Sequence, residues 1–476
     1  MLGAKQDYSV EMMCKTIVIG LGKTGLSCAH FLQSKGESFS VMDNRENPPC
    51  LTQFKADFPD VPVHLGEFDQ DVLHNVDRII LSPGVALREP VIAEAISRGA
   101  SVLGDIELFA QNANAPIIAI TGSNGKSTVT TLLGEMATQA GMNVKLGGNI
   151  GTPALELLNE QLKDNEKQDF YILELSSFQL ETTFSLNAFT SVILNISPDH
   201  MDRYEDLDAY SESKCRIFNG NGTIISNRDD ELVMDLVSKV TGKVTAKVTG
   251  KVNGTNSKRR VVSFGLSEPL AGEFGVSRVN DREYLAYGKH KVMPVDEMRI
   301  AGRHNCVNAL AAMALAHTMD ISESDTLAAL QNFTGLKHRT QWVASIEGVN
   351  WYNDSKGTNV GATVAAIKGL PGSKILIAGG VGKGADFSAL REAVIAGEVR
   401  AAILFGRDAG LIREKLIEVL PVEQVQDLTT AVQQAHKLAQ SGDSVLFSPA
   451  CASFDMFNNF EERGEAFIAA VKGLTK

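Results

Sequence analysis

The sequence predicts an α/β fold, built as doubly wound units in three domains. Short apolar runs recur along the chain, each ends in Gly, Ser, Asp or Asn, and a helix-like stretch follows. This alternation is typical of parallel α/β units. The chain has 476 residues, and at about 100 to 200 residues per domain this length favours about three domains. We place the domains at residues 1–110, 111–335 and 336–476.

The apolar runs fall into three groups that match these domains. The first group is KTIVIG (15–20), SFSVMD (38–43) and VDRIILSPG (76–84). The second is APIIAITG (115–122), DFYILELSS (169–177) and TSVILNISPDH (190–200). The third is GVNWYNDS (348–355), KILIAGG (374–380), AAILFG (401–406) and DSVLFSPA (443–450). Residues 239–254, KVTGKVTAKVTGKVNG, repeat a four-residue unit, which indicates a strand-turn excursion or a surface loop without an assigned function.

Charge and cysteine usage exclude several classes of protein. The formal net charge is -12 and no five consecutive residues are basic, which disfavours binding to nucleic acid or to an anionic membrane. The six cysteines are scattered without metal-finger spacing, as in a cytosolic protein with reduced thiols. No apolar run approaches the roughly 18 residues of a membrane span, and the first residues do not resemble a signal peptide. We therefore expect a soluble, cytoplasmic protein.

Residues 120–130, ITGSNGKSTVT, are similar to a phosphate-binding loop. The standard pattern G-x-x-x-x-G-K-[ST] requires a glycine where Ile120 stands, and the glycine comes at Gly122 instead. The segment joins an apolar strand run to a helix-like stretch, where backbone N–H groups and the helix dipole favour an anion. Lys126 can reach phosphate oxygens from this turn, and Ser127 or Thr128 offers a hydroxyl to Mg²⁺. A plain glycine turn is the alternative.

A second motif supports the nucleotide interpretation. The strand part of FYILELSS ends at Glu174. ATP enzymes use an acid at the end of a strand to hold the metal, and Glu174 is placed to serve as that acid. Glu174 could instead be an ordinary edge carboxylate. With both motifs in one α/β group, the sequence predicts ATP and Mg²⁺ as ligands.

The N-terminal motif GLGKTG (20–25) matches G-x-G-x-x-G between a strand run and a helix-like stretch. Asp43 ends the next strand, near the place where an acid binds a ribose hydroxyl, so the motif alone is typical of an NAD site. A lone glycine fingerprint is weak, because the pyrophosphate of any nucleotide fits such a turn. Lys23 and Arg45 add positive charge at this edge, and Ser82 offers a hydroxyl at the end of a neighbouring strand.

Lys214 stands in the segment DLDAYSESKCRIF (206–218), four residues after Tyr210 and three before Ile217. At helical spacing it shares their apolar face. A lysine there usually extends its amine to solvent. The chemical alternative is a desolvated, neutral amine that takes up CO₂ and becomes a carbamate, an anionic ligand for Mg²⁺. His200, on the loop after an apolar strand run, is either a structural residue or a contact to a second metal or a phosphate.

Taken together, these motifs resemble the Mur ligase family, the ATP-dependent amide-forming enzymes of peptidoglycan precursor synthesis. The matching segments are TGSNGKST, GGNIGTP (147–153), ELSSFQL (174–180), NISPDHMDRY, Lys214, GRHNCVNALAA (302–312), GLKHR (335–339) and NDSKGTN (353–359). They occur in the family's order and cover essentially the whole chain. GLGKTGLS and SPACASFDMFNNFEERG (448–464) are most similar to members that add D-glutamate, and the Asp-Asn-Pro-Arg motif of diaminopimelate- and lysine-adding members is absent.

The resemblance implies a Rossmann-like N-terminal domain that binds UDP, a P-loop ATPase-like central domain and a Rossmann-like C-terminal domain. It also implies that ATP phosphorylates the carboxylate of UDP-N-acetylmuramoyl-L-alanine, and that the amine of D-glutamate attacks the acyl phosphate. Two metal ions and a lysine would neutralise the charge that develops between two anions. A monomer without nucleic-acid or membrane partners is expected.

Site residues follow from the same resemblance. Catalytic roles fall to Lys126, Glu174, His200 and Lys214. ATP contacts are Gly122, Ser123, Asn124, Gly125, Lys126, Ser127, Thr128, Asn305, Asn308, Arg339, Asp354 and Lys356. The UDP substrate is assigned to Gly22, Lys23, Thr24, Asp43, Arg45, Ser82, Asn149 and His200, and D-glutamate to Thr358, Lys383, Ser453 and Phe460. Ser127 and Glu174 would hold one Mg²⁺, and His200 with carbamylated Lys214 the second.

The sequence departs from the family pattern at Lys23, where an apolar residue is expected, and at the repeat of 239–254. Three other functions fit the sequence less well. A folylpolyglutamate-type ligase lacks a comparable UDP domain. An NAD-dependent oxidoreductase leaves the phosphate loop, Glu174 and Lys214 unexplained, and a non-catalytic ATP switch leaves NDSKGTN and SPACAS without a role.

Overall fold

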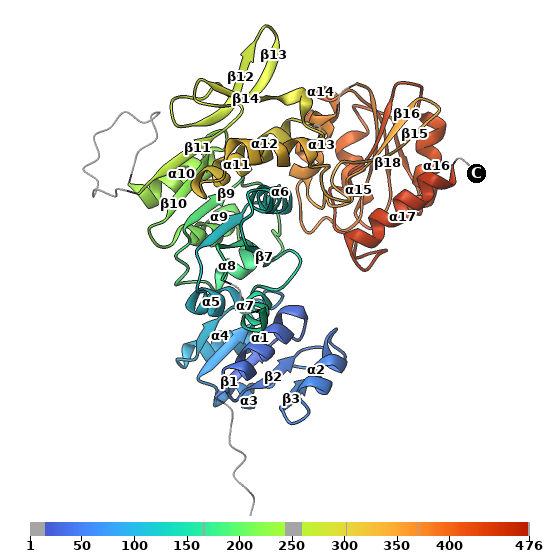
Figure 1. Ribbon diagram of the computed structural model, residues 1–476. Coiled ribbons are helices and arrows are strands. Elements are labelled where there is room, and N and C mark those ends of the chain that lie inside the picture. Colours follow the sequence, from blue (N-terminus) through green and yellow to red (C-terminus); the bar gives the residue numbers. More distant parts are fainter. Residues whose placement is uncertain (1–14, 165–166, 243–258, 301, 371, 475–476) are drawn as a thin grey trace, which may run out of the picture. The chain divides into compact units, whose positions relative to one another are not determined.

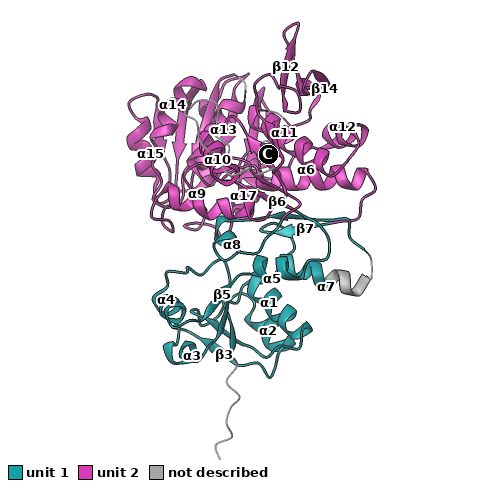
Figure 2. Cartoon of the chain, turned by 90° about the vertical axis from the view of Figure 1, so that its left-hand side faces the viewer, with its two compact units in different colours: residues 1–117, 145–187 teal, residues 118–144, 188–476 magenta. Residues whose placement is uncertain are grey.

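The structure is a computed structural model and describes residues 15–164, 167–242, 259–300, 302–370 and 372–474. Its described part divides into two compact units (Figure 2). Unit 1 consists of residues up to 117 together with 145–187, and unit 2 consists of 118–144 together with 188 onward. Most of the four-residue repeat, from residue 243 on, lies outside the described residues.

Unit 1 begins with a parallel sheet in the order β3-β2-β1-β4-β5. Its elements are β1 (Thr16–Ile19), α1 (Lys23–Ser34), β2 (Ser40–Asp43), α2 (Leu51–Asp57), β3 (Val63–Leu65), α3 (Gln70–His74), β4 (Arg78–Leu81), α4 (Pro90–Ser97), β5 (Ser101–Leu103) and α5 (Asp105–Asn112). Ile17, Ile19 and Ile79 form a core beneath the helices because strands covered on both faces are apolar throughout. The strand order reverses between β1 and β4, which places a ligand crevice at their carboxyl ends.

The rest of unit 1 comes from a later part of the chain. It contains β7 (Val144–Gly148), α7 (Ala154–Asp164), β8 (Phe170–Glu174) and α8 (Ser177–Glu181). Helices α1 and α5 both contact α7, so the second segment packs directly on the N-terminal domain.

Unit 2 opens with strands in the order β14-β13-β12-β11-β10-β9-β6. The elements of this part are β6 (Ile117–Thr121), α6 (Lys126–Gln139), β9 (Thr190–Ile193), α9 (Leu207–Cys215), η1 (Arg216–Phe218), β10 (Thr223–Asn227), α10 (Glu231–Thr241), β11 (Val261–Phe264), β12 (Phe274–Val279), β13 (Arg282–Tyr287), β14 (His290–Pro294), η2 (Val295–Glu297), α11 (Arg303–Thr318) and α12 (Glu323–Asn332). Helices α11 and α12 pack on α6, the helix of the phosphate loop (Figure 1). The antiparallel extension β12-β13-β14 was not predicted from the sequence.

The C-terminal part of unit 2 is a sheet in the order β15-β16-β20-β17-β18-β19, parallel except for β15 against β16. Its elements are β15 (Gln341–Ile346), β16 (Val349–Asn353), α13 (Val360–Gly369), β17 (Lys374–Ala378), α14 (Ser388–Ala396), β18 (Val399–Leu404), α15 (Ala409–Leu416), β19 (Val422–Gln424), α16 (Leu428–Leu438), β20 (Ser444–Phe447) and α17 (Phe460–Gly473). Apolar cores fill both faces of this sheet. Among the described residues, no helix combines the length and apolar character that a membrane span requires.

Candidate active site

The predicted phosphate loop lies between β6 and α6, at the carboxyl end of a buried strand. Gly125 caps the helix with a φ of 85°, and a Cβ there would lie 2.4 Å from Asn308 Oδ1. Only glycine fits such a position without strain, because both the backbone conformation and the space exclude a side chain. Lys126 Nζ donates to the carbonyls of Gly122 and Ser123 at 2.8 and 3.0 Å. The turn therefore combines open backbone with a lysine at the start of a helix, as anion binding requires.

The loop after β9 fixes the shape of the phosphate loop. Asn124 N donates to Asn195 Oδ1 at 2.8 Å, and Asn195 Nδ2 returns a bond to the carbonyl of Asn124 at 3.0 Å. Ser123 Oγ donates to the carbonyl of Ser197 at 2.9 Å and accepts from Ser197 N at 2.9 Å. These bonds hold the loop in one conformation before a ligand arrives, which lowers the ordering cost of binding.

A cavity of about 380 Å³ in unit 2 begins at the phosphate loop. It collects eight of the residues predicted to contact ATP, namely Asn124, Gly125, Thr128, Asn305, Asn308, Arg339, Asp354 and Lys356. Asn308 Nδ2 donates to Asn305 Oδ1 at 3.2 Å, which orients two neighbouring amides from α11. Arg339 lies at the phosphate end of the cavity, where its Nη2 donates to Ser127 Oγ at 2.8 Å. His304, which the prediction omitted, also lines the cavity, and burial lowers its pKa to about 4.

Asp354 follows strand β16 and is almost fully buried. Its carboxylate accepts from Thr340 N at 2.9 Å and from Ser448 Oγ at 2.6 Å. Burial raises its pKa to about 6 despite these bonds, so at neutral pH it is mostly an anion that accepts hydrogen bonds. Lys356 Nζ lies 3.7 Å from the centre of the Phe460 ring, which holds the amine at the edge of the same cavity.

Lys383 and Asp199 form a bond between the C-terminal part of unit 2 and the loop after β9. Lys383 Nζ lies 2.6 Å from Asp199 Oδ1, and both side chains are largely buried. Asn359 Nδ2 donates to Asp199 Oδ2 at 3.1 Å, and the Asn359 amide also bonds that of Asn124 in the phosphate loop. Asn359 was not in the predicted set, although its position as the N-cap of α13 within NDSKGTN could have indicated it. The cluster connects a predicted amino-acid-binding lysine directly to the phosphate loop.

His200 is next to Asp199 and has a φ of 58°, an unusual conformation for a residue with a side chain. Burial lowers its pKa to about 4, and the neighbouring Asp199 only partly offsets this effect. His200 is therefore a neutral imidazole at pH 7, the form that binds a metal ion. It lines neither the 380 Å³ cavity nor the pocket in unit 1 described below.

Lys214 lies inside unit 2 with only 1% of its surface exposed. The expectation that its amine reaches solvent is wrong, because the apolar face of α9 packs inward and takes the side chain with it. Its Nζ donates to the carbonyl of Gly122 at 3.2 Å and lies 4.6 Å from the centre of the Tyr210 ring. The amine is thus beside the first glycine of the phosphate loop.

The remaining residues predicted to bind D-glutamate lie in the C-terminal part of unit 2. Ser453 is buried after β20, and its carbonyl accepts from Met456 N and Phe457 N. Thr358 and Phe460 are half-buried, and Thr358 N donates to the carbonyl of Lys356. Neither the 380 Å³ cavity nor the pocket in unit 1 is lined by Thr358, Lys383, Ser453 or Phe460, and their common role stays a prediction.

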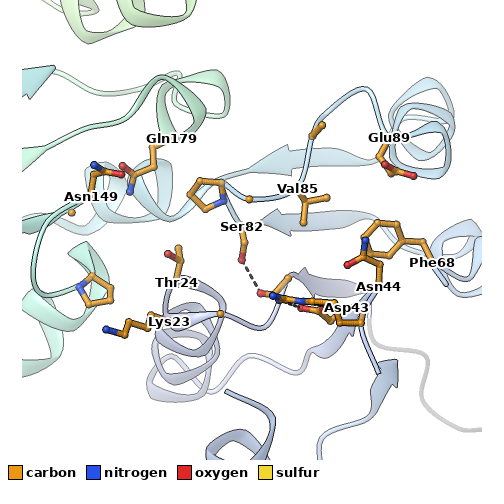
Figure 3. A pocket seen from close by; sticks show the side chains of 18 of the residues that line it. Lys23, Thr24, Asp43, Asn44, Phe68, Ser82, Val85, Glu89, Asn149 and Gln179 are labelled. Atoms are coloured by element: carbon orange, nitrogen blue, oxygen red, sulfur yellow. Dashed lines mark hydrogen bonds and ion pairs between the residues drawn. The ribbon is translucent and has the colours of Figure 1, made fainter. Parts of the chain in front are cut away.

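A second pocket, of about 780 Å³, lies within unit 1 (Figure 3). Seven residues predicted to bind the UDP substrate line it: Gly22, Lys23, Thr24, Asp43, Arg45, Ser82 and Asn149. Lys23 and Thr24 come from the first turn of α1, so the pocket also receives the N-terminal N–H groups of that helix. The pocket is also lined by four residues outside the predicted set: Asn44, Phe68, Glu89 and Gln179.

The Asp43 carboxylate has strong partners inside the protein. Arg45 donates from Nε to Oδ1 at 2.8 Å and from Nη2 to Oδ2 at 2.6 Å, and Leu21 N donates to Oδ2 at 2.6 Å. Burial raises the pKa of Asp43, but these bonds outweigh it and hold the pKa below its usual range. Asp43 therefore orients Arg45 at the pocket. Ser82 Oγ donates to the carbonyl of Gly20 at 2.8 Å and fixes the glycine turn.

Glu174 and Asn149 meet in unit 1. Asn149 Nδ2 donates to Glu174 Oε1 at 2.7 Å, whereas Glu174 Oε2 is buried and has no hydrogen-bond partner among the described residues. A buried carboxylate oxygen of this kind fits a hard cation such as Mg²⁺. Within the described part of the chain, no cluster of three His, Cys, Asp or Glu side chains could hold a metal ion by itself. Magnesium usually binds through one or two carboxylates with water and substrate phosphates, so this chain fits it without such a cluster.

Family models match three successive parts of the chain. They are the N-terminal domain of MurD-like Mur ligases (residues 14–104), the Mur ligase middle domain (120–316) and the Mur ligase glutamate ligase domain (338–451). The UDP-N-acetylmuramoylalanine--D-glutamate ligase of Nitrosococcus oceani is 50% identical over 464 residues, which cover 97% of each chain. The protein of the same name from Pseudomonas aeruginosa is 47% identical over 96% of this chain and 98% of its own.

Solved structures share the fold at lower sequence identity. UDP-N-acetylmuramate-alanine ligase MurC from Thermotoga maritima matches with a TM-score of 0.57 and 16% identity, covering 97% of this chain and 99% of its own. MurF from Acinetobacter baumannii matches with a TM-score of 0.60 and 15% identity, covering 96% and 90%. The three-domain α/β fold is confirmed by these matches and by the domain models. Because the models cover more than half of the chain and its relatives match nearly all of it, the chain belongs to the Mur ligase family.

Proposed function

We propose that this protein is a cytoplasmic, monomeric ATP-dependent ligase that adds D-glutamate to UDP-N-acetylmuramoyl-L-alanine in peptidoglycan precursor synthesis. The products are the amide, ADP and phosphate. The observation that carries the proposal is identity of about 50% over nearly the whole chain to relatives named for this reaction. The domain boundaries near residues 110 and 335 are part of the proposal.

The chain's groups act by positioning and charge. Lys126 and the backbone of Gly122–Ser127 bind the phosphates, while Asn305, Asn308 and Asp354 orient the nucleoside in the 380 Å³ cavity. The terminal phosphoryl group passes to the substrate carboxylate and forms an acyl phosphate. The amine of D-glutamate then attacks the acyl carbon, the tetrahedral intermediate loses phosphate, and the amine gives up a proton. No protein nucleophile is required for this sequence.

Two Mg²⁺ sites belong to the proposal. Ser127 and Glu174 would hold one ion, and the buried, unpartnered Oε2 of Glu174 supports that assignment. Neutral His200 and Lys214, carbamylated by CO₂, would hold the other. When bound, the ions neutralise the charge on phosphate and carboxylate oxygens.

The two substrates are assigned to different parts of the protein. The UDP group occupies the 780 Å³ pocket of unit 1, where Lys23, Arg45 and the start of α1 supply positive potential. D-Glutamate binds near Lys383, with Thr358, Ser453 and Phe460 as further contacts. Lys383 would exchange part of its bond with Asp199 for a substrate carboxylate.

Phosphate release from ATP tests the function. We expect release only when UDP-N-acetylmuramoyl-L-alanine and D-glutamate are both present, and none with L-glutamate. Phosphate release without either substrate would contradict the ligase function. Phosphate release with a folate in place of the UDP substrate would indicate the folylpolyglutamate-type alternative. A Lys126→Met variant is the matched control, because it keeps the length of the side chain and removes the charge that binds the phosphate.

A further inference from the structure

Gln179 reaches the UDP-substrate pocket from helix α8, and its side chain is held in place on both sides. It is the third residue of the helix, and its Oε1 accepts from Ser176 N and Ser176 Oγ at 3.1 and 3.2 Å. Ser176 Oγ in turn accepts from Gln179 N at 3.1 Å, which completes a capping box. The carbonyl end of the Gln179 amide is therefore committed to the helix cap.

Asp105 holds the other end of that amide. It is the first residue of α5 and is 2% exposed. Its Oδ2 accepts from Gln179 Nε2 at 2.9 Å, and its Oδ1 has no hydrogen-bond partner among the described residues. Burial raises the pKa of Asp105 to about 6, so the group is an anion at pH 8. A buried carboxylate with an unsatisfied oxygen costs stability, which points to a role other than packing.

An ionised carboxylate can only accept hydrogen bonds, and this property decides which way the Gln179 amide faces. It pairs with the N–H side of the amide and repels the carbonyl side, so an inverted amide would lose the bond to Asp105 and the bond to Ser176 N. Nε2 carries two hydrogens, and Asp105 takes only one of them. Gln179 therefore presents a donor, not an acceptor, to the pocket that it lines.

The position of Gln179 indicates which part of the ligand it meets. Figure 3 shows Gln179 and Asn149 toward one end of the pocket, with Asn44, Phe68 and Glu89 toward the other. Asn149 is bonded to Glu174, the carboxylate assigned to the metal, so its end of the pocket is the one nearer to the chemistry. If the UDP group lies along the glycine turn and Arg45, the acyl part of the substrate lies beside Gln179.

We propose that Asp105 is a positioning residue for substrate recognition, which fixes the amide of Gln179 so that its free N–H donates to an oxygen of the muramoyl-alanine part of the substrate. This inference rests on the proposed function. It concerns a carboxylate that does not line the pocket and acts only through Gln179.

The test is an Asp105→Asn variant, measured at pH 8. Asparagine has nearly the same shape but lacks the charge and offers donors as well as acceptors, so only the bond from Ser176 N still distinguishes the two orientations of Gln179. By calorimetry, we expect binding of UDP-N-acetylmuramoyl-L-alanine to weaken about three- to tenfold, the value of one hydrogen bond, and binding of UDP to stay unchanged. In turnover, the KM for the UDP substrate rises and kcat at saturation is retained.

Glu107→Gln is the matched control. Glu107 is a buried carboxylate on the same helix and accepts from Phe184 N and Ser185 N at 2.6 and 2.9 Å, but it does not line the pocket. Glu107→Gln should lower the melting temperature without changing the affinity for UDP or for UDP-N-acetylmuramoyl-L-alanine. If Asp105→Asn weakens UDP and the full substrate equally, or weakens neither, the proposal is overturned.

A double-mutant cycle separates action through Gln179 from a direct effect. Asp105→Asn should add nothing to Gln179→Ala, because the positioned group is already absent. Additive losses would overturn the proposal. Gln179→Ala alone should weaken the full substrate and not UDP, and wild-type affinity for the full substrate in this variant overturns the proposal even if Asp105→Asn does not fold. The proposed function is judged separately, by D-glutamate-dependent phosphate release from the wild-type protein.

Discussion

Lys383 Nζ lies 2.6 Å from Asp199 Oδ1, and these residues are 184 positions apart in the chain. The bond connects the C-terminal sheet of unit 2 with the loop that follows β9, and Asn359 extends it to the phosphate loop. Burial raises the pKa of Asp199, but the opposing effect of Lys383 and His200 is larger and holds the pKa below its usual value. The carboxylate is therefore ionised at pH 7. A substrate carboxylate that binds Lys383 would therefore have to share it with Asp199, which makes the pair sensitive to occupancy of the amino-acid site.

We expect Lys383→Ala to raise the KM for D-glutamate about ten- to a hundredfold, the range for a lost charge-assisted hydrogen bond. The KM for ATP should change little. Steady-state kinetics with each substrate varied in turn measures both values. Lys239→Ala is the control, because Lys239 also pairs with a carboxylate, Glu212, at 2.9 Å, but on the exposed surface. An unchanged KM for D-glutamate in Lys383→Ala would contradict the assignment.

Gly125→Ala should abolish tight ATP binding, because the added Cβ would lie 2.4 Å from Asn308 Oδ1 and the φ of 85° strains any side chain. We expect a loss of at least about a hundredfold, because each hydrogen bond to a charged ligand is worth about 1.5 to 3 kcal/mol and two of them are disturbed. Gly141→Ala separates the two causes, since Gly141 follows the other end of α6 with a φ of 73° and has nothing within 4 Å of its added Cβ. That variant should cost about 1 kcal/mol of stability and keep ATP affinity. Equal affinities in both variants would show that the clash with Asn308 has no effect.

The sequence was most informative where backbone chemistry decides the structure. The strand runs and the glycine turns at Gly20 and Gly122 could be predicted, because periodicity and turn chemistry are local. The pairing of Lys383 with Asp199 and of Asp105 with Gln179 could not, since each depends on the packing of distant segments. Lys214 was ambiguous for the same reason: its face could be predicted, but its depth depends on the elements that cover it.

Asp354→Asn should make the stability of the protein less dependent on pH. The pKa of Asp354 is about 6 in the fold, above its ordinary value of 3.8, so folding favours the protonated acid. Its contribution is fully present below pH 3.8 and is lost as pH rises through 6, by about 3 kcal/mol for a shift of about two units. The melting temperature of Asp354→Asn should therefore rise relative to wild type between pH 4 and pH 7.

The control for this pH effect is Asp386→Asn. Hydrogen bonds from Ser388 lower the pKa of Asp386, so the sign of its contribution is opposite. Its melting temperature should not gain on that of wild type over the same range. If the difference between Asp354→Asn and wild type is the same at pH 4 and pH 7, the carboxyl group of Asp354 is ionised as readily in the fold as in the unfolded chain.

Lys214→Ala tests whether this buried amine serves as a carbamate. The side chain is enclosed beside Gly122 and Tyr210, so a charged ammonium would be poorly solvated there, and a neutral amine can react with CO₂. The variant should lose ligase activity and regain part of it with a short carboxylate such as acetate, which can occupy the space and supply an anionic oxygen. Lys214→Arg keeps the positive charge but cannot form the carbamate, so it should stay inactive with or without acetate.

Lys374→Ala is the matched control, because Lys374 is equally buried and donates to the carbonyls of Gly372 and Gly397 far along the chain from the phosphate loop. It should lower the melting temperature, and acetate should have no effect on its activity. Full activity of Lys214→Ala without acetate would refute the carbamate, whereas rescue of Lys374→Ala would show that acetate acts on stability alone.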